Sequence, residues 1–122
     1  MQRIMLKSKI HRATVTDTLL HYEGSVGIDA YLLEQADILE GEQVHVFNIS
    51  NGHRFETYAI KESPHSGKII MKGAAARLAE PGDLIIIATY AFMNEEEYKH
   101  FSSLVVKVDE CNRLVRESER AD

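Results

Sequence analysis

The chain has 122 residues and a mass of 13.8 kDa, with 44% hydrophobic and 27% charged residues. This is enough for one domain with a modest core, and it excludes a two-lobed enzyme with a cleft between the lobes. The net charge is −5, and no basic stripe of the kind that nucleic-acid binders carry is visible, so no nucleic-acid partner is expected.

The cysteine content and the apolar runs of the sequence indicate in which cellular compartment the protein lies. Cys111 is the single cysteine, which excludes an internal disulfide framework and a multi-cysteine zinc site. The first twelve residues lack the apolar stretch of a secretory signal, and the longest apolar run, Leu84 to Ala88, is too short to cross a bilayer. We therefore expect a soluble, cytoplasmic protein with no membrane partner.

The dominant hydrophobic period along the chain is two, which predicts strands. In chain order, strands are expected at residues 3–10, 12–16, 19–28, 43–49, 54–60, 68–71, 84–91 and 104–108. Short helices are expected at residues 29–37, 73–78 and 94–100, with Asp29 and Asn94 as N-caps. Asn51-Gly52 predicts a tight hairpin turn with positive φ at both residues, and residues 61–67 a loop. The pattern predicts a mainly β fold over residues 1–122: one small barrel capped by short helices, with a charged, frayed tail from about Asp109.

Residues 1–24 are more basic than the rest, with four Lys or Arg against Asp17 and Glu23. This first segment is therefore expected to help bind something anionic. Gly24 and Gly27 interrupt the strand expected at residues 19–28, which predicts a bulge or a close approach of another part of the chain.

The six histidines show no HxH or HxxxH spacing and no paired cysteines. They are interpreted as surface or hydrogen-bonded side chains, and no metal is expected. Phosphate-binding glycine motifs and the GxSxG nucleophile motif are also absent from the sequence.

Gly24-Ser25 has two interpretations. In an arbitrary sequence this dipeptide is a turn at the end of a strand. Chemically, such a serine can attack the preceding carbonyl and cut the chain, leaving a ketone on residue 25 that replaces pyridoxal phosphate (PLP) as an electron sink. Glycine tolerates the strained backbone that this attack needs.

Two further stretches are candidates for a site. Arg54 and Tyr58 would share one face of a regular strand, about 13 Å apart, with Thr57 on the other face. The free N–H groups at the start of Gly73-Ala74-Ala75 could hold a carboxylate. Each stretch also has an ordinary structural interpretation, as a solvated strand and a tight helix start.

Taken in order, these stretches resemble the pyruvoyl-dependent aspartate 1-decarboxylase family. The resemblance covers residues 1 to about 95. The segments that carry it include Lys9-Ile10-His11-Arg12, His21-Tyr22-Glu23-Gly24-Ser25, Asn51-Gly52 with Arg54-Phe55, Glu56-Thr57-Tyr58-Ala59-Ile60, Gly73-Ala74-Ala75-Ala76-Arg77 and Ile85-Ile86-Ile87.

The resemblance implies a double-psi β-barrel, assembled as a homotetramer with active sites between subunits. It implies self-cleavage between Gly24 and Ser25, giving a small chain of residues 1–24 and a large chain of residues 25–122 that begins with a pyruvoyl group made from Ser25. Neither PLP nor a metal is needed. The implied reaction converts L-aspartate into β-alanine and CO2 for pantothenate synthesis, and an accessory maturation factor is a possible partner.

The resemblance also implies roles for individual residues. Tyr58 matches the proton donor, and Thr57 matches a residue that assists cleavage and touches substrate. Lys9 and Arg54 match the residues that bind carboxylates, and Gly73, Ala74 and Ala75 match the backbone that lines the substrate site.

One residue departs from the family pattern. Lys72 precedes Gly73-Ala74-Ala75, where the family usually has Asn beside the cleavage site. Lysine there could slow processing, change substrate preference or point away. Two other functions stay open: a non-catalytic double-psi barrel that binds a partner, and a sister decarboxylase for another acidic amino acid.

Overall fold

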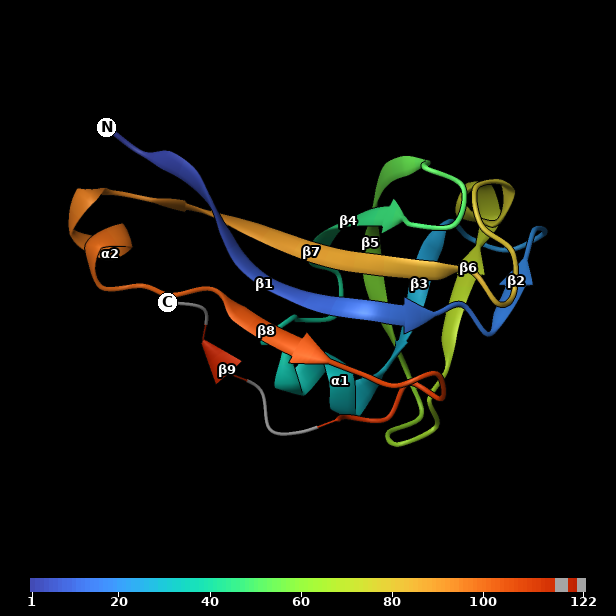
Figure 1. Ribbon diagram of the computed structural model, residues 1–122. Coiled ribbons are helices and arrows are strands. Elements are labelled where there is room, and N and C mark those ends of the chain that lie inside the picture. The colour runs from blue at the N-terminus through green and yellow to red at the C-terminus, as the bar shows by residue number, and fades with distance from the viewer. Residues whose placement is uncertain (116–118, 121–122) are drawn as a thin grey trace.

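The computed structural model describes residues 1–115 and 119–120, in which nine strands form one mixed sheet (Figure 1). The strand order is β2-β6-β3-β5-β4-β7-β1-β8-β9. The strands are β1 (Arg3–Thr14), β2 (Asp17–Leu19), β3 (Ser25–Asp29), β4 (Gln43–Asn48), β5 (Arg54–Glu62), β6 (Ile69–Lys72), β7 (Leu84–Met93), β8 (Leu104–Lys107) and β9 (Glu119–Arg120). The helices are α1 (Ala30–Gln35), the 3-10 helix η1 (Gly73–Arg77) and α2 (Glu95–Lys99).

The longest pairing in the sheet joins β1 and β7, which run antiparallel side by side in Figure 1. The sequence predicted two strands, at residues 3–10 and 12–16, where the structure has the single strand β1. Register shifts at Leu6/Ser8 and Ile10/Ala13, with a positive φ of 62° at Arg12, let the strand bend and stay paired.

The core consists of apolar side chains from the central strands and from α1, with burial at alternate positions along β4 and at every position of β3 and β6. The largest completely buried ones include Ile10, Val26, Ile28, Leu32, Val44, Val46, Ile69, Met71, Ile85 and Ile87. Burial of each such side chain stabilises the fold by roughly 1.5–3 kcal/mol. The period of two in the sequence therefore identified the face that turns inward.

Both predicted helix caps are confirmed. The Asp29 side chain accepts a hydrogen bond from the Tyr31 N–H at the start of α1. Asn94 and Glu97 form a reciprocal capping box at the start of α2, whose first turn is acidic as the helix dipole favours.

The hairpin between β4 and β5 exists, but its predicted turn geometry is wrong. Gly52 has a φ of 80°, whereas Asn51 does not have a positive φ. Asn48 shapes the connection instead, because its Oδ1 atom accepts hydrogen bonds from the N–H groups of Ser50 and Asn51. A longer loop with side-chain hydrogen bonds replaces the two-residue turn.

The tail is ordered beyond the point where fraying was predicted. Asn112 is buried, accepts a hydrogen bond from the Thr14 N–H and donates to the carbonyls of Thr14 and Gly67. The expectation of a frayed tail is wrong for residues 109–115, and residues 116–118 and 121–122 lie outside the described residues.

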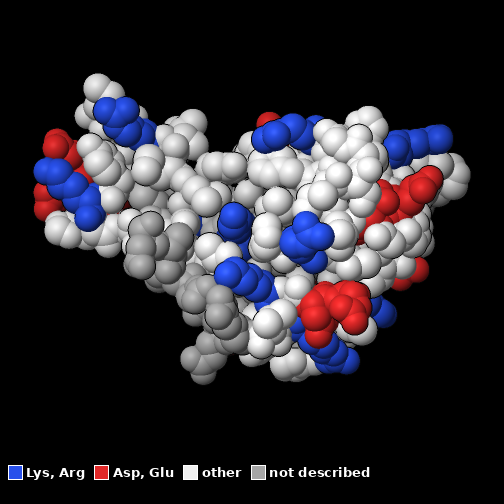
Figure 2. Space-filling view, in the orientation of Figure 1, with Lys and Arg blue, Asp and Glu red and all other residues white. Residues whose placement is uncertain are grey.

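Two surface properties bear on partners. In the part of the chain that the structure describes, no helix is both long and apolar enough to cross a membrane. The face drawn in Figure 2 carries Lys and Arg side chains that are scattered among uncharged surface and some acidic side chains.

Candidate active site

The strand β3 lies between β5 and β6 and exposes different chemistry on its two faces. Val26, together with Ala59 of β5 and Met71 of β6, faces the core, and all three are completely buried. Side chains alternate along strands, so Ser25 and Gly27 face the opposite side. We call this second side of β6, β3 and β5 the site face.

Ser25 begins β3 and is almost fully buried, with 1% of its surface exposed. Its Oγ atom donates a hydrogen bond of 3.4 Å to the carbonyl of Glu23, which is long for a hydroxyl donor. The hydroxyl is therefore shielded from bulk water and only weakly held beside its own preceding residues.

Gly24 lies directly against Gly73. A Cβ atom on Gly73 would come within 2.6 Å of Gly24 Cα and 2.8 Å of the Tyr22 carbonyl oxygen, and Gly73 has a positive φ of 66°. The approach of two backbones therefore requires glycine at position 73. The predicted Gly73-Ala74-Ala75 segment does lie beside Gly24-Ser25, since the Ala74 nitrogen is 3.9 Å from the position of a Gly24 Cβ.

Tyr58 and Thr57 take opposite faces of β5, as the sequence predicted. Val26 is level with Ala59 in the parallel β3–β5 pair. The preceding residues, Ser25 and Tyr58, are therefore level with each other, and both project on the site face. Tyr58 is 39% exposed, and Thr57 is partly buried on the other face. The register of one chain thus places Tyr58 on the site face at the level of Ser25 and leaves Thr57 on the far side of the strand.

Arg54 and Lys9 lie away from Ser25 within one chain. Arg54 begins β5, stacks its guanidinium 4.2 Å from the Phe47 ring centroid and lines a groove with His45 and Tyr90. Lys9 lies on β1, which β5, β4 and β7 separate from β3 in the strand order. The structure of one chain does not gather all the predicted site residues.

His11, two residues beyond Lys9, has an unusual environment. Its Nδ1 atom is buried and has no hydrogen-bond partner among the described residues. Burial lowers the pKa of His11 below the ordinary value of a histidine side chain, and the positive charges of Lys9, Arg12 and Lys107 lower it further. His11 therefore favours the neutral form in the folded chain.

One site-face residue was missed by sequence reasoning: Glu62, which forms an ion pair with Lys72. The Lys72 Nζ atom lies 2.9 Å from Glu62 Oε2, and both side chains are largely buried. Lys72 therefore does not point away into solvent. Residues 61–67 were predicted as a loop, but β5 continues to Glu62, and its alternation through Tyr58 and Ile60 was the signal that could have placed Glu62 on this face.

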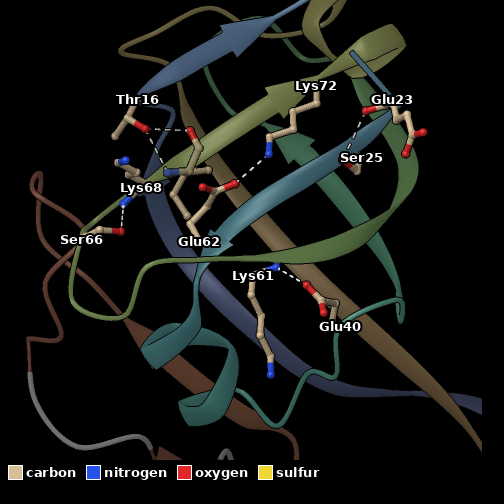
Figure 3. A network of polar contacts seen from close by, with 10 residues as sticks. Thr16, Glu23, Ser25, Glu40, Lys61, Glu62, Ser66, Lys68 and Lys72 are labelled. Atoms are coloured by element: carbon tan, nitrogen blue, oxygen red, sulfur yellow. Dashed lines mark hydrogen bonds and ion pairs between the residues drawn. The ribbon is translucent and has the colours of Figure 1, made fainter.

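Figure 3 shows how these residues lie. The Lys72 side chain runs from β6 across β3 to the carboxylate of Glu62, and Ser25 lies at the start of the same strand. Within residues 1–115 and 119–120, no group of three His, Cys, Asp or Glu side chains is placed to hold a metal ion.

Comparison with known proteins is consistent with this geometry. A family model described as aspartate decarboxylase matches residues 1–115. The aspartate 1-decarboxylase of Thermoanaerobacter pseudethanolicus is 56% identical over 115 residues, which are 94% of this chain and 98% of that protein. Those of Herminiimonas arsenicoxydans and Kosmotoga olearia are each 58% identical, covering 93% and 94% of this chain and 96% and 98% of their own lengths.

The mainly β architecture and the matching family model define a protein of the double-psi β-barrel class, which confirms the fold expected from the sequence. The chain belongs to the aspartate decarboxylase family, whose members depend on a pyruvoyl group.

Proposed function

We propose that this chain cuts itself between Gly24 and Ser25 and then decarboxylates L-aspartate to β-alanine and CO2, supplying pantothenate synthesis. The observation that carries the proposal is the position of the Gly24–Ser25 bond in a chain of this family. Ser25 begins a buried strand, and Gly24 packs against Gly73. In the register of β3 and β5, Ser25 is level with Tyr58.

The residues around Ser25 fit a pyruvoyl group made in place. Residue 25 is shielded from water, and the contact between Gly24 and Gly73 leaves no room for a side chain at position 73. A pyruvoyl group supplies a ketone that binds the substrate amine and draws electrons from the bond to the departing carboxylate. The chain itself must therefore hold the substrate carboxylates, exclude water and deliver a proton.

We assign these tasks to the residues that the family resemblance marks. Tyr58 is 39% exposed and is level with residue 25 in the register of β3 and β5, and its hydroxyl donates a proton to the substrate carbon after CO2 leaves. Lys9 and Arg54 bind carboxylates, and the N–H groups of the Gly73–Ala75 segment line the site. Thr57 assists cleavage.

The separation of Lys9 from Ser25 within one chain supports a shared site between subunits. We therefore propose that the protein works as a homotetramer in which one subunit supplies carboxylate-binding residues to the Ser25 of another. A cytoplasmic location and an accessory maturation factor stay predictions.

The decisive experiment combines an intact-mass spectrum with a product assay. We expect two fragments, residues 1–24 and residues 25–122 with a blocked N-terminus, and release of β-alanine from L-aspartate without added PLP. A chain that remains whole and releases no β-alanine would contradict the proposal and favour a binding module. Parallel incubation with L-glutamate distinguishes a sister enzyme, because preferred turnover of glutamate would overturn the substrate assignment.

A further inference from the structure

The buried ion pair between Lys72 and Glu62 occupies the same face as Ser25. Lys72 of β6 is directly opposite Ser25 in the antiparallel β3–β6 pair, and Glu62 is level with Asp29 in the β3–β5 pair. Residues that are level on paired strands share a face, so both side chains project on the site face. The ion pair therefore spans β3 on the site face, with Lys72 opposite Ser25 and Glu62 level with Asp29.

Glu62 depends on Lys72 for the balance of its charge. Its Oε2 atom is buried and accepts no hydrogen bond in the described part of the chain, whereas the Lys72 ammonium lies 2.9 Å from it. A buried carboxylate that lost this partner would be left uncompensated. The two side chains thus hold each other in one position.

Gly27 provides the space for this carboxylate. A Cβ atom at position 27 would lie 2.1 Å from Glu62 Oε2 and 2.8 Å from its carboxyl carbon. Since the atoms that clash are the mobile end of a side chain, alanine at this position would displace the carboxylate rather than disrupt the strand. The position of the Glu62 carboxylate therefore depends on the missing side chain of Gly27 on β3 and on the ammonium of Lys72 on β6.

The ammonium also contacts the segment that precedes the cleavage bond. Lys72 Nζ lies 4.9 Å from the centroid of the Tyr22 ring, within the range of a cation–π interaction. The next residue, Gly73, packs on the Gly24 backbone. Lys72 and Gly73 therefore contact the segment of residues 22–24 at two points, Tyr22 and Gly24.

We propose that Glu62 is a positioning residue for self-cleavage: it holds the Lys72 ammonium against Tyr22, so that residues 22–24 present the Gly24 carbonyl to the Ser25 hydroxyl. This rests on the proposed function. In the step served, Ser25 Oγ bonds to the Gly24 carbonyl carbon, and the bond from that carbon to the Ser25 nitrogen breaks. The hydroxyl proton ends on that nitrogen, so the step is an isomerisation that needs no other reactant.

The experiment measures the half-time of cleavage of freshly purified precursor by intact mass, together with the melting temperature. Glu62→Gln and Gly27→Ala should each slow cleavage roughly tenfold or more, because a misplacement of about 1 Å can cost up to 10²-fold in rate. Tyr22→Leu, which removes the ring, should also slow cleavage, whereas the matched control Tyr22→Phe keeps the ring and should cleave like the parent.

The double variant Glu62→Gln with Lys72→Met separates positioning from stability, because it leaves no unpaired buried charge. We expect its melting temperature to recover relative to Glu62→Gln while its cleavage stays slow. Parental cleavage rates in Glu62→Gln and Gly27→Ala, or in the double variant, would overturn the inference. A parent chain that never cleaves would instead overturn the proposed function, which keeps the two failures distinct.

Discussion

The two ends of β3 carry buried polar side chains that are bonded very differently. At its C-terminal end, Asp29 Oδ1 accepts hydrogen bonds from the N–H groups of Tyr31 and His65, and Oδ2 accepts one from Gly67. At its N-terminal end, the Ser25 side chain makes one hydrogen bond, of 3.4 Å, to the Glu23 carbonyl.

This contrast distinguishes polar groups that stabilise the fold from polar groups available for chemistry. A saturated buried network rigidifies a structure, whereas an unsatisfied buried group costs free energy that folding must offset elsewhere. The Asp29 end joins α1, the loop after β5 and, through Gly67, the tail residue Asn112. The Ser25 end leaves a buried hydroxyl with one long hydrogen bond, so this hydroxyl is available for chemistry.

The largest expected effect comes from Ser25→Ala, which removes the nucleophile and the source of the pyruvoyl group. The variant should remain full length by intact mass and release no β-alanine, and its melting temperature should stay close to that of the unprocessed parent, because the lost hydrogen bond is long. If Ser25→Ala formed β-alanine, Ser25 would not be the source of the cofactor.

Tyr58→Phe tests the other reactive group at this end. It removes only a hydroxyl, so folding and self-cleavage should persist while the turnover of L-aspartate falls roughly 10²–10⁴-fold, the usual contribution of a positioned acid. Steady-state assays on fully processed protein measure this effect. Turnover near that of the parent would exclude Tyr58 as the proton donor.

Asp29→Ala tests the saturated end. Its loss leaves buried N–H groups without an acceptor, which costs about 1–3 kcal/mol for each group that water cannot reach. Chemical denaturation should therefore show a lower free energy of unfolding, while the cleavage rate of the folded precursor stays near the parental value. A strong slowing of cleavage without loss of stability would remove the distinction between the two ends.

The smallest expected effect concerns His11, an under-bonded group outside β3. Its pKa is lowered in the folded chain, so below about pH 6.5 the unfolded chain binds its proton first and the stability of the fold decreases as pH falls further. The melting temperature of the parent should therefore drop more between pH 7.5 and pH 5 than that of His11→Gln, to an extent too small to unfold the protein. Equal drops would show that His11 contributes nothing to this dependence.

Much of the fold could be predicted from the sequence because its signals are local. Alternation placed most of the strands and identified the inward face, and Asp29 and Asn94 were recognised as caps from their positions before short helical segments. The single strand predicted at residues 19–28 is wrong, because β2 ends at Leu19 and β3 begins only at Ser25. The family motif around Gly24-Ser25, with Tyr58 and Gly73, likewise needed no coordinates; in the structure Gly73 packs against Gly24, and Tyr58 is level with Ser25 in the register of β3 and β5.

The rest depended on which strands pair and in what register. Glu62 and Lys72 were read as a loop residue and an isolated departure, and only the pairing of both β5 and β6 with β3 makes them one buried ion pair over Gly27. Asn112 was assigned to a frayed tail, although its side chain connects Thr14 to Gly67. Residue type and hydrophobic period can be read from the sequence. A contact between distant strands depends on their register, and the register is set only when all the strands bury their apolar faces in the same core.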